Sequence, residues 1–301
     1  MTYLQAIIMG ILQGVTELFP ISSLGHSVIL PALVPGWKAL AVMQARPESL
    51  FLAFLVALHV GTGVALFIFF RKEWYRIIGG FFHTLRTRRI ETPDERLAWL
   101  LIVATIPAGI IGLLLEHALR VVFAKPLYAS ILLMVNGLIL ALGERVRRRS
   151  AVRELALAHG TYEGTEARRL ETLEFKEAAI IGGAQVFALL AGISRSGITM
   201  VAGLVRGLSH EDAARFSFLL ATPIILAAGL YKLPDLTGPL GSNIRGQAIV
   251  GAVAAGIAAY LSVKFLTKYF ETRTLTPFAI YCLVVGGIMT IYFGFIASPI
   301  S

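Results

Sequence analysis

The sequence carries little charge for its length. Only 15% of its 301 residues are Asp, Glu, Lys or Arg, whereas 56% are hydrophobic and the mean hydropathy is +0.76. Because soluble globular proteins are about a quarter charged, this composition excludes an ordinary water-soluble domain. Cysteine is nearly absent as well. The single Cys282 lies inside an apolar segment, which excludes an intramolecular disulfide and a metal site built from cysteines.

Patterns that identify nucleotide-binding and zinc-dependent proteins are also missing. There is no P-loop and no dinucleotide fingerprint, and most histidines lack the spacing of metal ligands. We interpret these histidines as structural residues: His59, His83, His117, His159 and His210. The net charge of +9 does not indicate a nucleic-acid partner, because Lys and Arg gather in short loops beside apolar runs, as in membrane proteins.

The sequence is instead rich in apolar runs long enough to cross a membrane, which takes about 20 helical residues. Two further apolar segments, 4–35 and 178–207, are interrupted by Gly/Ser-rich centres and are predicted to be re-entrant hairpins. The predicted fold class is an all-α polytopic membrane protein with six transmembrane helices plus two re-entrant helical hairpins. The predicted transmembrane helices are 52–70, 97–115, 127–144, 212–231, 246–267 and 276–296.

The distribution of Lys and Arg predicts the orientation of the chain. Segments 71–96, 144–177 and 264–273 hold seven, eight and three of these residues, and cytoplasmic loops carry the basic excess. We therefore expect a multi-pass protein with both termini outside. With that orientation, the two hairpins enter the membrane from opposite sides.

Opposite insertion is the geometry of an inverted repeat, and the sequence supports an internal duplication. Residues 13–25 align without gaps on 185–197, and Gln, Ile, Ser and Gly match at the same offsets. The predicted organisation is a first repeat over 1–149 (hairpin 4–35 plus three crossings), a cytoplasmic linker over 150–174, and a second repeat over 175–301 (hairpin 178–207 plus three crossings).

Ionisable side chains inside apolar segments are costly and mark functional sites by default. Glu17, His26 and Arg195 stand out, and all three lie in the predicted hairpins. If the hairpin tips meet, a carboxylate, an imidazole, hydroxyls and a guanidinium form one polar pocket. The other polar residues expected to line it are Gln13, Ser22, Ser23, Ser194, Ser196 and Thr199.

Each of these side chains has a chemical and a structural interpretation. Arg195 suits a phosphate because a guanidinium donates two parallel hydrogen bonds and stays charged, but it could instead pair structurally with Glu17. Glu17 can hold a divalent cation or act as a general base, or it can cap a helix. His26 can accept a proton from Ser23 or Ser22, protonate a departing phosphate, or act as a cap. Ser23 is the predicted nucleophile, with attack by water as the alternative.

Segments 13–26 and 192–199 resemble the two signature motifs of the undecaprenyl-diphosphate phosphatase family, also called bacitracin-resistance proteins. Segments 216–223 and 277–281 are similar to other family segments, so the resemblance covers the whole chain. It implies an enzyme of the bacterial cytoplasmic (inner) membrane that removes the terminal phosphate of undecaprenyl diphosphate, on the outer side and with a divalent cation, Mg or Ca. The reaction recycles the lipid carrier of cell-wall synthesis and confers bacitracin resistance.

The resemblance implies four catalytic residues, Glu17, Ser23, His26 and Arg195, with Glu17 also a metal ligand. Two positions depart from the family pattern. Gln13 stands where the first motif has its first acidic residue, which removes one of two carboxylates, and Ala191 replaces the Pro that usually opens the second motif. A transporter or flippase for polyprenyl phosphate is the main alternative, because inverted repeats with broken helices also occur in secondary transporters. The oligomeric state stays open, with a homodimer as one option.

Overall fold

The computed structural model describes residues 1–37, 40, 50–123, 125–157, 168–237 and 244–297. In this part of the chain the structure is built from helices and contains no β-strand. The helices are α1 (Tyr3–Thr16), α2 (Ser23–Leu33), α4 (Leu50–Phe69), α5 (Arg71–Thr87), α6 (Pro93–Phe123), α7 (Pro126–Leu157), α8 (Phe175–Ala184), α9 (Arg195–Val205), α10 (His210–Thr237), α11 (Arg245–Phe270) and α12 (Thr276–Ile291). Short helical turns are η1 (Leu170–Thr172), η2 (Gln185–Leu189) and η4 (Tyr292–Ile296).

Most of the predicted crossings correspond to single long helices. The helices long and apolar enough to cross a membrane are Pro93–Leu114, Pro126–Arg149, His210–Tyr231, Arg245–Phe270 and Thr276–Ile296. The remaining predicted crossing, 52–70, corresponds to α4, which continues into α5 with a bend of 84°. The chain is therefore an all-α multi-pass membrane protein.

The basic segment 71–96, which the sequence analysis treated as a loop, and the start of the predicted linker 150–174 are helical. α5 occupies much of the basic segment 71–96, and α7 continues past the start of the predicted linker 150–174. In α5 the apolar side chains of Trp74 and Ile77 are buried on one face, while its basic residues lie on the exposed face. The density of Lys and Arg had obscured this helical periodicity. Residues 158–167 of the linker lie outside the described part of the chain.

The helices expose apolar side chains on their outer surface, as a protein in lipid does. On α6, Ile106, Ile110 and Leu113 are more than half exposed, and they follow one another at helical spacing. Such a stripe would be unfavourable in water, whereas hydrocarbon chains solvate it. Polar side chains are instead gathered inside the bundle.

The two hairpin helices pack on other helices through glycines at matching positions. Gly10 on α1 lies against the backbone of Gly251 on α11, and Gly182 on α8 lies against the backbone of Ala104 on α6. At either glycine a Cβ atom would overlap the facing carbonyl oxygen. Small residues permit such close backbone approach in membranes. Each glycine precedes the matching glutamine, Gln13 or Gln185, by three positions, so this packing supports the predicted duplication.

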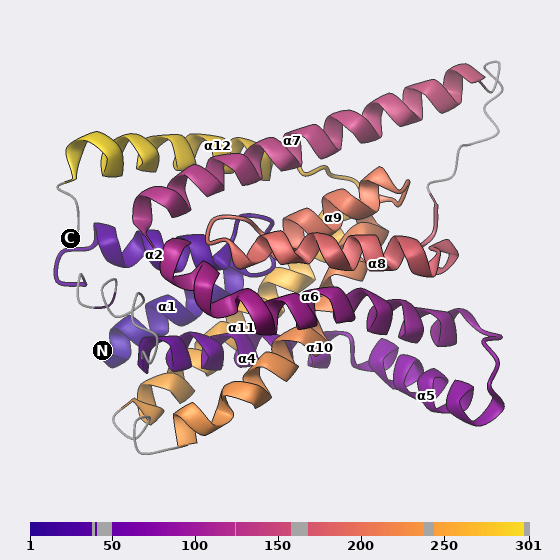
Figure 1. Cartoon of the computed structure of the whole chain (residues 1–301), viewed down its shortest axis with the longest axis horizontal. Helices are drawn as coiled ribbons and strands as arrows, with labels where there is room; N and C mark the ends of the chain where they lie inside the picture. Colours follow the sequence, from indigo (N-terminus) through magenta and orange to yellow (C-terminus); the bar gives the residue numbers. More distant parts are fainter. Residues whose placement is uncertain (38–39, 41–49, 124, 158–167, 238–243, 298–301) are drawn as a thin grey trace.

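The interrupted segments 4–35 and 178–207 each contain two α-helices separated by a break, as predicted; in the second, the 3₁₀ turn η2 follows α8 before the non-helical residues 190–194. Figure 1 shows α1 and α8 running toward the centre of the molecule from opposite ends, so that the α1–α2 tip and the η2–α9 tip meet there. The corresponding pairs α1 with α11 and α8 with α6 are in contact. The division into two repeats remains a prediction that this packing supports.

Candidate active site

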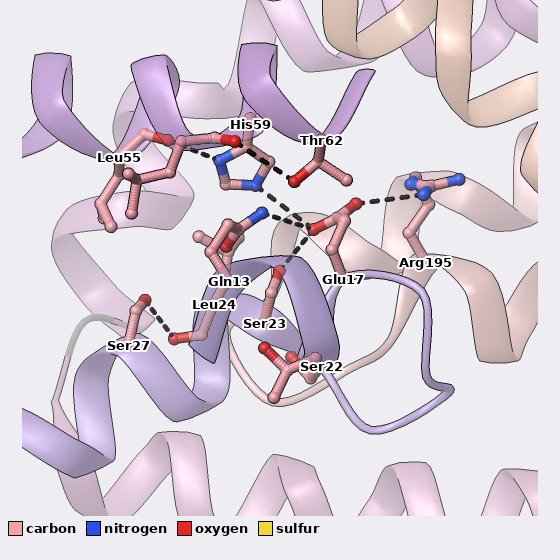
Figure 2. Close-up of polar contacts among 12 residues, drawn as sticks. Gln13, Glu17, Ser22, Ser23, Leu24, Ser27, Leu55, His59, Thr62 and Arg195 are labelled. Atoms are coloured by element: carbon pink, nitrogen blue, oxygen red, sulfur yellow. Dashed lines mark hydrogen bonds and ion pairs between the residues drawn. The ribbon is translucent and has the colours of Figure 1, made fainter. Parts of the chain in front are cut away.

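The carboxylate of Glu17 is the centre of the polar cluster where the two tips meet. Glu17 directly follows α1 and is 8% exposed. Its Oε2 atom accepts hydrogen bonds from Gln13 Nε2 (3.1 Å) and from the Ser23 hydroxyl (2.5 Å). Its Oε1 atom accepts from Arg195 Nη2 at 3.0 Å. Figure 2 shows these side chains, from α1, α2 and α9, pointing at one carboxylate.

The first tip is built around Ser22, which caps α2. Its Oγ accepts hydrogen bonds from the backbone N–H of Gly25 (3.2 Å) and from that of Gly192 in the second tip (3.1 Å). Ser22 has a φ of 70°, in the left-handed region that residues other than Gly rarely adopt. These bonds hold the strained turn, and the turn directs the next residue, Ser23, toward Glu17. In this structure Ser22 therefore holds the two tips together, and its predicted role in substrate binding stays a prediction.

The second tip repeats this arrangement with a different functional group. Ser194 caps α9 by accepting from the N–H of Gly197 at 3.1 Å. Arg195 is the first residue of α9, as Ser23 is the first residue of α2. The two serine-capped helix starts thus deliver a hydroxyl from the first tip and a guanidinium from the second to the same carboxylate.

Asn136 on α7 joins the two tips. Its Nδ2 donates to the carbonyl oxygen of Pro20 (2.9 Å), and its Oδ1 accepts from the N–H of Ser194 (3.0 Å). The side chain is completely buried. Sequence analysis missed this residue, although a lone Asn within the apolar run 127–144 was a signal that could have identified it.

The guanidinium of Arg195 has a hydrogen-bond donor that no described residue uses. Nη2 binds Glu17, and Nη1 lies 3.4 Å from the carbonyl oxygen of Ser217. The Nε atom is buried, and it has no hydrogen-bond partner in the part of the chain that the structure describes. An unpaired buried donor of a charged group is costly. A phosphate oxygen would satisfy it, so the geometry supports a phosphate-binding role in addition to the Glu17 ion pair.

The structure places His26 differently from the expected proton relay. Its Nδ1 lies 2.7 Å from the backbone oxygen of Ser22, and its Nε2 lies 2.8 Å from the Tyr281 hydroxyl. A carbonyl oxygen only accepts, so Nδ1 carries the proton and Nε2 accepts from Tyr281. It is Glu17, and not His26, that accepts the hydrogen bond from the Ser23 hydroxyl. His26 thus ties the first tip to α12.

His59 belongs to the site, although sequence analysis interpreted it as a structural residue. Its Nε2 lies 3.4 Å from Glu17 Oε2, and its Nδ1 lies 2.8 Å from the Leu55 carbonyl oxygen. By the same argument, Nδ1–H donates to that carbonyl, which leaves Nε2 directed at the carboxylate (Figure 2). The missed signal was an ionisable residue within the apolar run 52–70.

The remaining predicted residues are buried around the tips and bond mainly to the backbone. The Ser196 hydroxyl donates to the carbonyl of Phe19 at 3.3 Å and lies 3.0 Å from Ser194 Oγ. The Thr199 hydroxyl donates to the carbonyl of Arg195 at 2.7 Å. These groups hold the second tip, and neither contacts Glu17.

A divalent cation would find one carboxylate here. Among the described residues, no group of three or more His, Cys, Asp or Glu side chains could hold a metal ion. Glu17, the amide oxygen of Gln13 and the Ser23 hydroxyl are oxygen ligands near one another here. Hard cations such as Mg²⁺ bind through one or two carboxylates when substrate phosphates complete the shell. The donor set therefore fits a cation that shares its ligands with a bound diphosphate, and not one held by protein alone.

Comparison with known proteins identifies the family. A family model described as bacitracin resistance protein BacA matches residues 6–288. Undecaprenyl-diphosphatase 2 of Frankia alni is 55% identical to this chain, and the alignment covers 97% of this chain and 98% of the relative. Undecaprenyl-diphosphatase of Mycolicibacterium paratuberculosis is also 55% identical, with 95% and 96% covered. A Burkholderia thailandensis undecaprenyl-diphosphatase 2 is 45% identical, with 98% of both chains covered. The chain belongs to the bacitracin resistance protein BacA family.

Proposed function

We propose that this protein hydrolyses undecaprenyl diphosphate to undecaprenyl phosphate and inorganic phosphate. The observation that carries the proposal is the meeting of Ser23 and Arg195 on Glu17. A hydroxyl bonded to a carboxylate lies beside a guanidinium that has an unpaired donor. The printed names of the relatives point to the same substrate. A transporter would need to bind a lipid phosphate but would not need a hydroxyl paired with a base, so the geometry favours the enzyme.

The residues suggest a direct displacement at the terminal phosphorus. Arg195 binds the terminal phosphate, and the Ser23 oxygen attacks while Glu17 takes the hydroxyl proton. The Oγ–P bond forms as the bond from phosphorus to the bridging oxygen breaks, and that oxygen leaves with undecaprenyl phosphate. Water then cleaves the phosphoserine and releases phosphate. If water attacks directly instead, Glu17 takes its proton, since phosphoryl transfer depends mainly on positioning and charge stabilisation.

His26 and His59 support this chemistry from either side of the carboxylate. His26 holds the first tip through the Ser22 carbonyl and Tyr281. His59 faces the oxygen of Glu17 that also accepts from Ser23, so it is placed to receive a proton that Glu17 has taken. A divalent cation, Mg²⁺ or Ca²⁺, would be held by Glu17 and Gln13 with the diphosphate, and would neutralise phosphate charge.

The location in the cell is part of the proposal. We place the protein in the bacterial cytoplasmic membrane with both termini and the active site on the outer side, supported by the uneven distribution of Lys and Arg. A homodimer also remains a proposal, which the mass of the detergent-solubilised protein would test.

The test is phosphate release from undecaprenyl diphosphate by purified protein, with and without EDTA. We expect release by the wild type and loss of release in Glu17→Ala, Ser23→Ala and Arg195→Ala. Ser130→Ala is the matched control, because this buried hydroxyl on α7 donates only to the Pro126 carbonyl in the described structure. Arg206→Ala controls for a positive charge at the other end of α9. No release by folded wild type with a cation present would overturn the proposal.

A further inference from the structure

A groove with basic side chains and an apolar lining lies at the end of α11 and does not include the Glu17 cluster. It is a groove of about 470 Å³, within the range of about 300–1,000 Å³ typical of small-molecule sites. Its lining is Leu261, Lys264, Phe265, Lys268, Tyr269, Thr272 and Arg273. Three cationic side chains therefore share one groove with two aromatic rings.

The charges of this groove are not neutralised by the protein. In the part of the chain that the structure describes, no ion pair involves Lys264, Lys268 or Arg273. By contrast, Arg168 is paired with a carboxylate 2.7 Å away, and Arg215 with one 2.9 Å away. Three exposed cations that form no ion pair with a described residue leave this groove able to bind an anion from elsewhere.

The position of the groove indicates which kind of anion. α11 is a membrane span that ends at Phe270, so Lys264 and Lys268 lie in its last two turns and Arg273 follows its end. Long basic side chains near a span's end extend to the headgroup level, and Tyr is enriched at the same level. Leu261 lies one turn further into the span than Phe265, and both supply apolar surface to the lining.

One wall of the groove is formed by aromatic contacts. The Phe265 ring, which is 54% exposed, stacks on Phe19 of the first tip, with centroids 6.0 Å apart, and it also packs against Tyr269 at 5.6 Å. Aromatic rings prefer such stacked or tilted contacts. These contacts position the ring beside the basic side chains while its outer face stays open to an apolar ligand.

We propose that this groove binds the phosphate headgroup of an anionic glycerophospholipid from the adjacent leaflet, with an acyl chain against Leu261 and Phe265. Lys264, Lys268 and Arg273 supply the positive charge, and a zwitterionic lipid would not compensate it. Basic residues at a helix C-terminus also interact favourably with the helix dipole. That effect alone predicts no preference for one lipid over another. The proposal is independent of the phosphatase activity.

The test compares lipid binding by two variants with the same loss of charge. Full-length protein in detergent is titrated with phosphatidylglycerol or phosphatidylcholine, and binding of the first lipid is measured by native mass spectrometry. The site variant is Lys264→Gln with Lys268→Gln and Arg273→Gln. The control is Lys72→Gln with Arg86→Gln and Arg88→Gln, all exposed residues of or beside α5.

We expect wild type and control to prefer phosphatidylglycerol and the site variant to lose the preference, by about fivefold for each charge removed, since each is worth about 1 kcal/mol near an anionic surface. Phosphate release and the thermal unfolding midpoint should not change, which shows that the site variant is folded. Three results would overturn the proposal: no preference in wild type, an equal loss in both variants, or displacement of phosphatidylglycerol by undecaprenyl phosphate at a lower concentration.

Discussion

The substitution Arg195→Lys separates the two roles that the structure gives to Arg195. The guanidinium presents Nη2 to Glu17 Oε1 at 3.0 Å and Nη1 to the Ser217 carbonyl at 3.4 Å, and its Nε is unpaired. Lysine keeps the positive charge but has one nitrogen. It can neutralise Glu17 or reach a phosphate oxygen, but it cannot do both in the fork geometry of arginine.

The magnitude follows from this count of donors. Loss of one preorganised donor to a developing phosphate charge costs on the order of 3 kcal/mol, or about 10²–10³ in kcat. The fold should be largely retained, because lysine leaves no uncompensated carboxylate. Arg195→Ala does leave one, and breaking a buried pair in this way costs about 3–5 kcal/mol. We therefore expect Arg195→Lys to lose about 10²–10³ in kcat and remain stable, and Arg195→Ala to lose at least as much and to be destabilised.

The assay is the initial rate of phosphate release from undecaprenyl diphosphate in detergent micelles, together with the thermal unfolding midpoint of each variant. Near-wild-type kcat/KM in Arg195→Lys would refute the argument from the arginine fork, because charge alone would then suffice. Equal destabilisation of both variants, with activity that follows only the folded fraction, would reduce Arg195 to a structural partner of Glu17.

Further predictions test the neighbouring residues. Ser23→Ala should lower kcat by at least about 10² if Ser23 is the nucleophile, and mass spectrometry of acid-quenched wild type should then show a phosphoserine at this position; wild-type turnover by Ser23→Ala would favour attack by water. Tyr281→Phe leaves the buried Nε2 of His26 without its donor and should lower the free energy of unfolding by about 1–3 kcal/mol, measured by thermal unfolding; an unchanged midpoint would contradict the contact. Gly182→Ala places a Cβ against the Ala104 carbonyl and should destabilise the fold by about 1–3 kcal/mol, whereas Gly183→Ala, where a Cβ meets nothing within 4 Å, should be neutral; similar midpoints for the two variants would argue against the close packing of α8 on α6.

Several features could be predicted from the sequence because they depend on local composition. The membrane spans follow from the length and polarity of single runs, and the interrupted hairpins follow from Gly and Ser within such runs. Glu17 and Arg195 stood out because a charge in an apolar segment is costly wherever the segment goes. Ser22 and Ser194 stood out in the same way, as hydroxyls within the Gly/Ser-rich breaks of these runs.

Other features depend on which segments pack together, and only the tertiary structure decided them. Ser23 and Arg195 both bind the carboxylate of Glu17, although Arg195 and Glu17 are 178 positions apart in the sequence. Neither motif by itself shows that the two segments are in contact. His59 resembled a structural histidine until α4 was placed beside the first tip, and Tyr281 became the partner of His26 because α12 lies against it. The 84° bend between α4 and α5 was also visible only in the structure, where α5 packs against α6. The free-energy cost of burying a charged side chain can be predicted from the apolar residues around it in the sequence. A hydrogen bond instead requires two groups about 3 Å apart. For groups distant in the sequence, only the packing of the helices determines that separation.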